Sequence, residues 1–174
     1  MKNYLRILFL ALAGVLALSA CGPSDEEKQK AAAAAAEAEA MKPVPLPAPG
    51  ADKASWQKYL VSVVKHNMQG VKSNQPYMYF VPSGDAQDVQ DARQSQLDNV
   101  SGTVSRGVLP GNMLAFGGPD SKLTADLVTA AFKDASDGSF KDVIVLFVGA
   151  AADQDRVKDA LAKSGATYRF VEMK

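Results

Sequence analysis

Few side chains in this chain belong to the types that commonly carry out chemistry. Cys21 is the only cysteine and His66 the only histidine among 174 residues. A Ser-His-Asp triad or a histidine-containing zinc site would need His66. The apolar pattern places His66 near the end of a helix that leads into the first strand, and the sequence has no GxSxG motif. We therefore predict no catalytic residue, and expect His66 to be partly exposed beside an apolar helix stripe.

Three glycine-containing loops are candidates for a ligand site. Each follows a predicted strand and precedes a predicted helix, and ligands of open parallel sheets bind beyond the carboxyl ends of the strands. Backbone N–H groups and carboxylates there could converge on a small polar ligand or an anion. The candidate residues are Ser83, Gly84 and Asp85 in the first loop, Gly118, Asp120 and Ser121 in the second, and Gly149 and Asp153 in the third.

The alternative for these loops is purely structural. Aspartate and serine are favoured N-cap residues, and glycine turns the chain. Because no GxGxxG or GxxxxGK[ST] motif is present, we favour the capping interpretation. Asp85, Asp88, Asp120 and Asp153 would form a Mg²⁺ site only if the loops met, and none lies at the last position of a strand. We predict no metal site and no cofactor.

A fourth candidate surface is the sequence GTVSRGVLPGNM, residues 102 to 113. It is predicted to be an apolar, glycine-rich loop with Arg106 at its centre and Val108 and Leu109 beside it. Exposed apolar loops of this kind bind protein partners. Packing of the loop against the domain is the equally open alternative.

The first twenty residues have the pattern of a targeting segment. Lys2 and Arg6 precede an unbroken apolar run from Ile7 to Leu18, which is too short to span a bilayer. Leu18-Ser19-Ala20-Cys21 follows, and this junction resembles the lipobox of bacterial lipoprotein precursors. The resemblance covers only the signal and its junction.

The resemblance implies that Cys21 is alkylated with diacylglycerol, that residues 1–20 are removed, and that the new amino terminus is acylated. Two or more acyl chains anchor a protein stably to a membrane. Members of the family retained at the inner membrane carry aspartate where Gly22 stands, so the resemblance favours the periplasmic face of an outer membrane. A secreted protein with a free cysteine remains the alternative.

Residues 21–50 are predicted to form a tether. Ser24 and Glu27 fit a capping box, and an alanine-rich run continues the predicted helix over residues 25–42. Proline occupies every second position from Pro43 to Pro49, which favours an extended spacer over a helix. We favour a simple tether over a specific PxxP ligand.

Residues 51–174 are predicted to form one α/β domain. Apolar periodicity indicates helices over 53–68, 85–99, 122–136 and 153–164, and strands over 77–81, 112–116, 143–148 and 167–172. This alternation predicts a four-stranded, mostly parallel sheet with flanking helices, for which we expect the strand order 2-1-3-4. The domain carries 14 basic and 14 acidic residues, so we predict no nucleic-acid partner.

The expected function is that of a non-enzymatic, protein-binding lipoprotein. It would be attached to the outer membrane through Cys21 and would bind a periplasmic protein, as an accessory of an envelope or secretion assembly or as an immunity protein against a toxin. The alternative is a small-ligand-binding or weakly catalytic domain that uses the carboxyl-end loops.

Overall fold

The computed structural model describes residues 29–30 and 42–174, so Cys21, the signal segment and almost all of the predicted tether helix lie outside the described residues. The folded domain alternates helices and strands. Its elements are α2 (Lys53–His66), β1 (Tyr77–Phe80), α3 (Gln87–Arg106), β2 (Met113–Gly117), α4 (Ser121–Phe132), β3 (Ile144–Gly149), α5 (Ala151–Ala162) and β4 (Thr167–Glu172).

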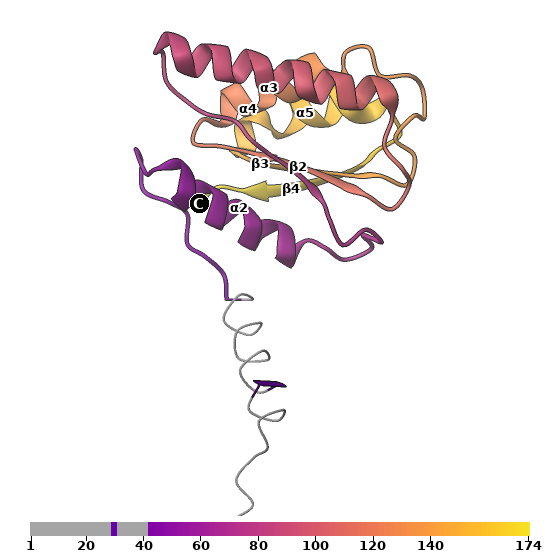
Figure 1. Ribbon diagram of the computed structural model, residues 1–174. Coiled ribbons are helices and arrows are strands. Elements are labelled where there is room, and N and C mark those ends of the chain that lie inside the picture. The colour runs from indigo at the N-terminus through magenta and orange to yellow at the C-terminus, as the bar shows by residue number, and fades with distance from the viewer. Residues whose placement is uncertain (1–28, 31–41) are drawn as a thin grey trace, which may run out of the picture. The chain divides into compact units, whose positions relative to one another are not determined.

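The four strands form one fully parallel sheet, which confirms the predicted α/β class. The strand order is β1-β2-β3-β4, so the expected order 2-1-3-4 is wrong. Each right-handed crossover steps to the same side, and such crossovers place their helices on one face of the sheet. Order 2-1-3-4 would have put α3 on the opposite face. That face is covered by α2, while α3, α4 and α5 cover the other (Figure 1).

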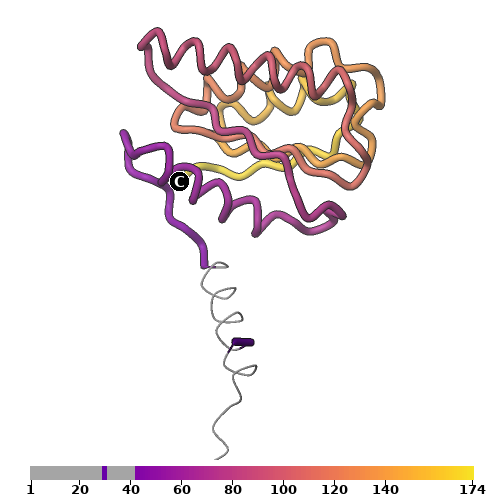
Figure 2. The backbone as a smooth tube through the Cα atoms, viewed as in Figure 1, coloured from indigo at the N-terminus to yellow at the C-terminus, as the bar shows by residue number. Residues whose placement is uncertain are grey.

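The sheet therefore has two separate apolar layers. Side chains of β3 alternate between them: Val145 and Phe147 join the cluster under α3, α4 and α5, whereas Ile144, Leu146 and Val148 join the cluster under α2. All six residues of β3 are buried, as its unbroken apolar run predicts for a strand covered on both faces. The tube in Figure 2 follows the chain through these layers.

Helix α3 is longer than the sequence pattern predicts. It continues past Gly102 to Arg106, so the expected loop over residues 102–106 is a helical turn. Val100 and Val104, one turn apart, are both buried in the core. Burial of a valine outweighs the cost of about 1 kcal/mol for one glycine inside a helix. The helix ends at Gly107, whose φ of 76° is costly for other residues.

Part of the proline-rich segment, which we assigned to the tether, packs along α2. The N–H of Val44 donates to Oγ of Ser62 over 3.1 Å, and this serine is only 4% exposed. Leu46 packs against the apolar cluster under α2. The folded part of the chain thus begins before residue 51.

Candidate functional site

The strand order gives the three loops at the carboxyl ends no switch point, which is the place where open parallel sheets usually bind ligands. A switch point lies where the strand order reverses, and neighbouring loops there lead to helices on opposite faces. In the order β1-β2-β3-β4 there is no reversal. All three loops lead to helices on the same face of the sheet.

Asp120 caps α4, as the capping interpretation predicts. Its Oδ1 accepts a hydrogen bond from the N–H of Leu123 over 2.9 Å. Its carbonyl oxygen accepts from Oγ1 of Thr124 over 2.9 Å. The first of these bonds satisfies an N–H group that the first helical turn would otherwise leave unpaired.

Ser121 and Asp153 are brought together although they are 32 residues apart in sequence. Oγ of Ser121 donates to Oδ2 of Asp153 over 2.6 Å and accepts from the N–H of Ala150 over 2.7 Å. Asp153 is not the N-cap of α5, because Ala150 holds that position without a side-chain cap. A serine from α4 thus ties down the start of α5.

Two basic residues extend this contact into a network between α4 and α5. Arg156 bonds Oδ1 of Asp153 over 2.8 Å and also pairs with Asp126, which Lys122 contacts over 2.9 Å. Burial raises the pKa of Asp126, but hydrogen bonds from Lys122 and Arg156 outweigh burial, so the pKa lies below its ordinary value. The polar groups of the second and third loops therefore bond one another.

Sequence reasoning missed Asp126 and Arg156. The spacings Lys122–Asp126 and Asp153–Arg156 each place two opposite charges on one helix face. That signal is local, however, whereas the pairing of Arg156 with Asp126 joins two helices. The pairing of Arg156 with Asp126 could be predicted only if α4 and α5 were known to be neighbours.

Close packing accounts for the glycines of the second and third loops. A Cβ on Gly118 would lie 2.0 Å from the carbonyl oxygen of Val81, and one on Gly149 would lie 2.7 Å from Oγ of Ser121. No real Cβ is found at such distances. Contacts within the fold, without any ligand, require both glycines.

The loop of Ser83, Gly84 and Asp85 is exposed and does not join this network. Arg93 from α3 donates to the carbonyl oxygens of Pro82 and Gly84, over 3.2 and 2.8 Å. Ala86 rather than Asp85 is the N-cap of α3, and it makes no side-chain cap bond. The capping interpretation is therefore wrong for Asp85. Within the described ranges, no three His, Cys, Asp or Glu side chains are grouped so that they could hold a metal ion.

His66 lies apart from these loops. It is the exposed last residue of α2, and its Nδ1 is 2.7 Å from the carbonyl oxygen of Ser62. A few residues later, the N–H of Lys72 donates to the carbonyl oxygen of Gly111, just before β2 begins. This places the end of α2 at the amino edge of the sheet, opposite Ser121 and Asp153.

The candidate partner loop is shorter than predicted. Arg106 is the last residue of α3, and Val108 is partly buried against the core. Leu109 is 77% exposed. Only residues 107–112 thus form a loop, and Leu109 is the apolar side chain that this loop presents to solvent.

The fold and the site define an α/β domain with a parallel sheet of uniform strand order, in which two of the three carboxyl-end loops are joined by their own polar contacts. Comparison with known proteins finds no matching family model, no matching curated protein and no matching solved structure. Among the described helices, none combines the length and the apolar character needed to cross a membrane.

Proposed function

We propose that this protein is a lipoprotein, anchored through Cys21 to the periplasmic face of the outer membrane, whose α/β domain binds another envelope protein without catalysing a reaction. An accessory of an envelope or secretion assembly, or an immunity protein, would act in this way. One observation carries the proposal: Ser121 and Asp153 of two candidate ligand loops bond each other, while Tyr77, Met78 and Leu109 expose large apolar side chains.

Partner binding can be tested by site-specific photo-crosslinking of the full chain, expressed at native level in its own bacterium. A photoreactive amino acid would replace Met78 or Leu109, with Lys133 as an exposed control position on α4's end. We expect a discrete protein adduct from Met78 or Leu109 and none from Lys133. If neither apolar position yields an adduct, the proposal is abandoned.

The anchor is tested separately with Cys21→Ser. We expect wild type to fractionate with the outer membrane and to incorporate radiolabelled palmitate, and the variant to do neither. A variant that is still acylated and still found in the membrane fraction would contradict the lipid anchor. If the lipid anchor were rejected in this way, the crosslinking test of partner binding would still stand.

A further inference from the structure

The two edges of the sheet differ in how they are protected. Edge strand β4 carries Arg169 and Glu172, and charges on an edge discourage pairing with another strand. Edge strand β1 reads Tyr-Met-Tyr-Phe and carries no charge. Tyr77 and Met78 are each 45% exposed. The shortness of β1 and the flanking Pro76 and Pro82 protect this edge, but no charged side chain does.

Some backbone groups of β1 face away from the sheet and have no hydrogen-bond partner among residues 42–174. The N–H of Val81 donates to the carbonyl oxygen of Gly117 on the β2 side, over 2.9 Å. Because successive residues of a strand point their N–H and C=O groups to alternate sides, those of Met78 and Phe80 point away from β2. The edge therefore offers two donors and two acceptors to an added strand.

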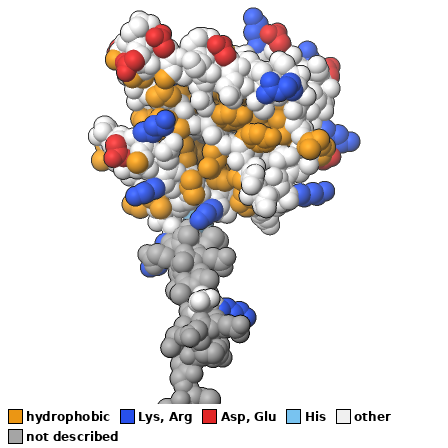
Figure 3. Space-filling model, viewed as in Figure 1, with side chains coloured by type: hydrophobic (Ala, Val, Ile, Leu, Met, Phe, Trp, Pro, Cys, Tyr) orange, Lys and Arg blue, Asp and Glu red, His pale blue; other side chains and the backbone are white. Residues whose placement is uncertain are grey.

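An apolar groove runs beside this edge, between β1 and α2. It has a volume of about 280 Å³ and is lined by Met78, Phe80, Leu60, Val61 and Gln57. Gln57 and Val61 also line a second hollow on α2, which Val44 borders. Figure 3 shows hydrophobic side chains gathered between the levels of α3 and α2. An added strand could place alternate apolar side chains in the first groove.

The charge around the groove is positive. Lys53 lies with Nζ 6.0 Å from the ring centroid of Phe80, and Lys58 and Lys65 line the second hollow. Residues 42–81, which supply α2 and β1, contain five lysines and one acidic residue, Asp52. The carboxylate of Asp52 caps α2 through the N–H of Ser55 over 2.7 Å. Residues 82–174 carry 13 acidic and 10 basic residues, so the excess of positive charge belongs to the segment that supplies α2 and β1.

We propose that edge strand β1 and its groove bind an extended, acidic segment of a partner protein, which adds to the sheet as a fifth strand. Backbone hydrogen bonds to Met78 and Phe80 would supply affinity, and the groove would select apolar residues at alternate positions. Lysines 53, 58 and 65 would attract the acidic side chains that flank them. This inference rests on the proposed protein-binding function and names the chemistry of the partner.

Charge argues against one other occupant, and the backbone groups of β1 argue against another. A second copy of the chain would bring two lysine-rich surfaces together, and like charges across an interface are unfavourable. An anionic membrane would suit the lysines, but it would leave the outward N–H and C=O groups of β1 without partners. A peptide strand satisfies the lysines, the groove and the backbone together.

The test is a selection from a library of random peptides, each about twelve residues long, on the full chain purified in detergent. We expect enriched peptides to carry Asp or Glu and apolar residues at every second position. The best peptide is then resynthesised with single N-methyl groups along its backbone. Because only alternate N–H groups of an added strand face β1, methylation should weaken binding at every second residue only.

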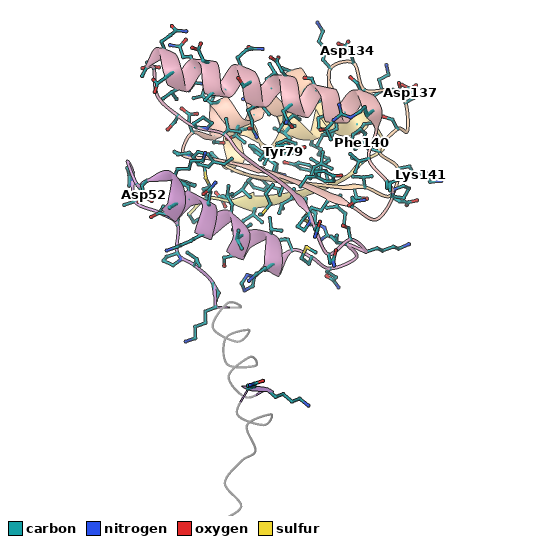
Figure 4. All side chains as sticks on the ribbon, viewed as in Figure 1. Asp52, Tyr79, Asp134, Asp137, Phe140 and Lys141 are labelled. Carbon is teal, nitrogen blue, oxygen red and sulfur yellow. The ribbon has the colours of Figure 1, made fainter. Side chains whose placement is uncertain are left out.

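Charge reversal provides a matched pair of variants. Lys58→Glu with Lys65→Glu should weaken binding of the selected peptide about tenfold at low salt, and less at high salt because screening reduces the attraction. The control is Lys133→Glu with Lys141→Glu, at exposed positions outside the α2 layer. Lys141 lies at the far end of the domain from Asp52 (Figure 4). The control should bind like wild type.

Met78→Asp should abolish binding, and circular dichroism checks that it is folded. No enrichment, enrichment of basic peptides, N-methyl effects without alternation, or full binding by Met78→Asp would each overturn the proposal. So would binding to phosphatidylglycerol vesicles that needs Lys58 and Lys65 but not Met78. Crosslinks from Leu109 with no peptide selection would retain the protein-binding function and reject β1 as its site.

Discussion

At Asp120, the effect of substitution on stability can test whether the residue serves as a helix cap. Its carboxylate is used as the N-cap of α4, so Asp120→Ala should lower the free energy of unfolding by about 1 kcal/mol. Asp120→Asn keeps an N-cap oxygen and should cost much less. Urea unfolding of the three proteins measures both effects. If asparagine were as damaging as alanine, the negative charge itself would be needed, and capping would not account for this residue.

Tyr168 should make the domain sensitive to alkaline conditions. Burial, with the nearby charge of Asp155, raises its pKa from 10.0 to about 12. The unfolded chain releases this proton first, so stability that is fully present below pH 10 is lost as the pH rises toward 12. Tyr168→Phe should therefore lose less stability than wild type between pH 9 and pH 11 in urea unfolding.

Ser139→Ala, which removes a hydroxyl group from an exposed loop, is the control for this comparison. Its stability should change with pH as that of wild type does. The tyrosine hydroxyl of Tyr168 also donates to the carbonyl oxygen of Gln154 over 3.2 Å. For that reason the comparison uses each protein's change with pH and not its absolute stability. Equal slopes for wild type and Tyr168→Phe would contradict the prediction.

Substitution by alanine should have opposite effects on stability at Gly102 in α3 and at Gly118 in the loop after β2. Gly102 is inside a helix, where a Cβ would lie 3.3 Å from the end of the flexible Arg106 side chain, so Gly102→Ala should stabilise by about 0.5–1 kcal/mol. Gly118→Ala would push a Cβ into the backbone of Val81 and should destabilise by about 1–3 kcal/mol. Thermal unfolding of both variants measures these effects. Destabilisation by Gly102→Ala would contradict the placement of Gly102 inside helix α3.

The number and order of the elements could be predicted from periodicity, because each has its own apolar pattern. The end of α3 could not, since a glycine usually ends a helix and only the burial of Val104 carries this one past Gly102. The strand order also could not. The apolar stripe of α2 shows that this helix has a buried face, but it does not show which face of the sheet the helix covers. The face that α2 covers leaves the opposite face for α3.

The candidate site shows the same division between local and long-range signals. The cap at Asp120 depends on residues three positions away and could be predicted. The bond between Ser121 and Asp153 depends on two helices being neighbours. The net charge of the domain concealed a separation of charge along the sequence: residues 51–174 are balanced, but the segment that forms α2 is rich in lysine. Tyr79 lies on the α3 side of the sheet (Figure 4). Its ring stacks on that of Phe116, with the ring centroids 5.0 Å apart.

The whole domain is attached to the preceding chain through α2. Ser62 accepts a hydrogen bond from Val44 and donates one to the carbonyl oxygen of Lys42 over 3.4 Å, so the segment entering the domain is held along this helix.

Hydrogen exchange can test this attachment. In residues 43–49, only Val44, Leu46 and Ala48 have backbone N–H groups, because the others are proline. The N–H of Val44 should exchange slowly in wild type. Ser62→Ala removes its acceptor and should accelerate that exchange about fivefold or more, since a hydrogen bond of this kind contributes about 1 kcal/mol. Ser139→Ala, a loop serine bonded to Ser136, is the control and should leave Val44 unchanged. Fast exchange at Val44 in wild type would show that the proline-rich segment is free of α2, and that the folded domain begins after it.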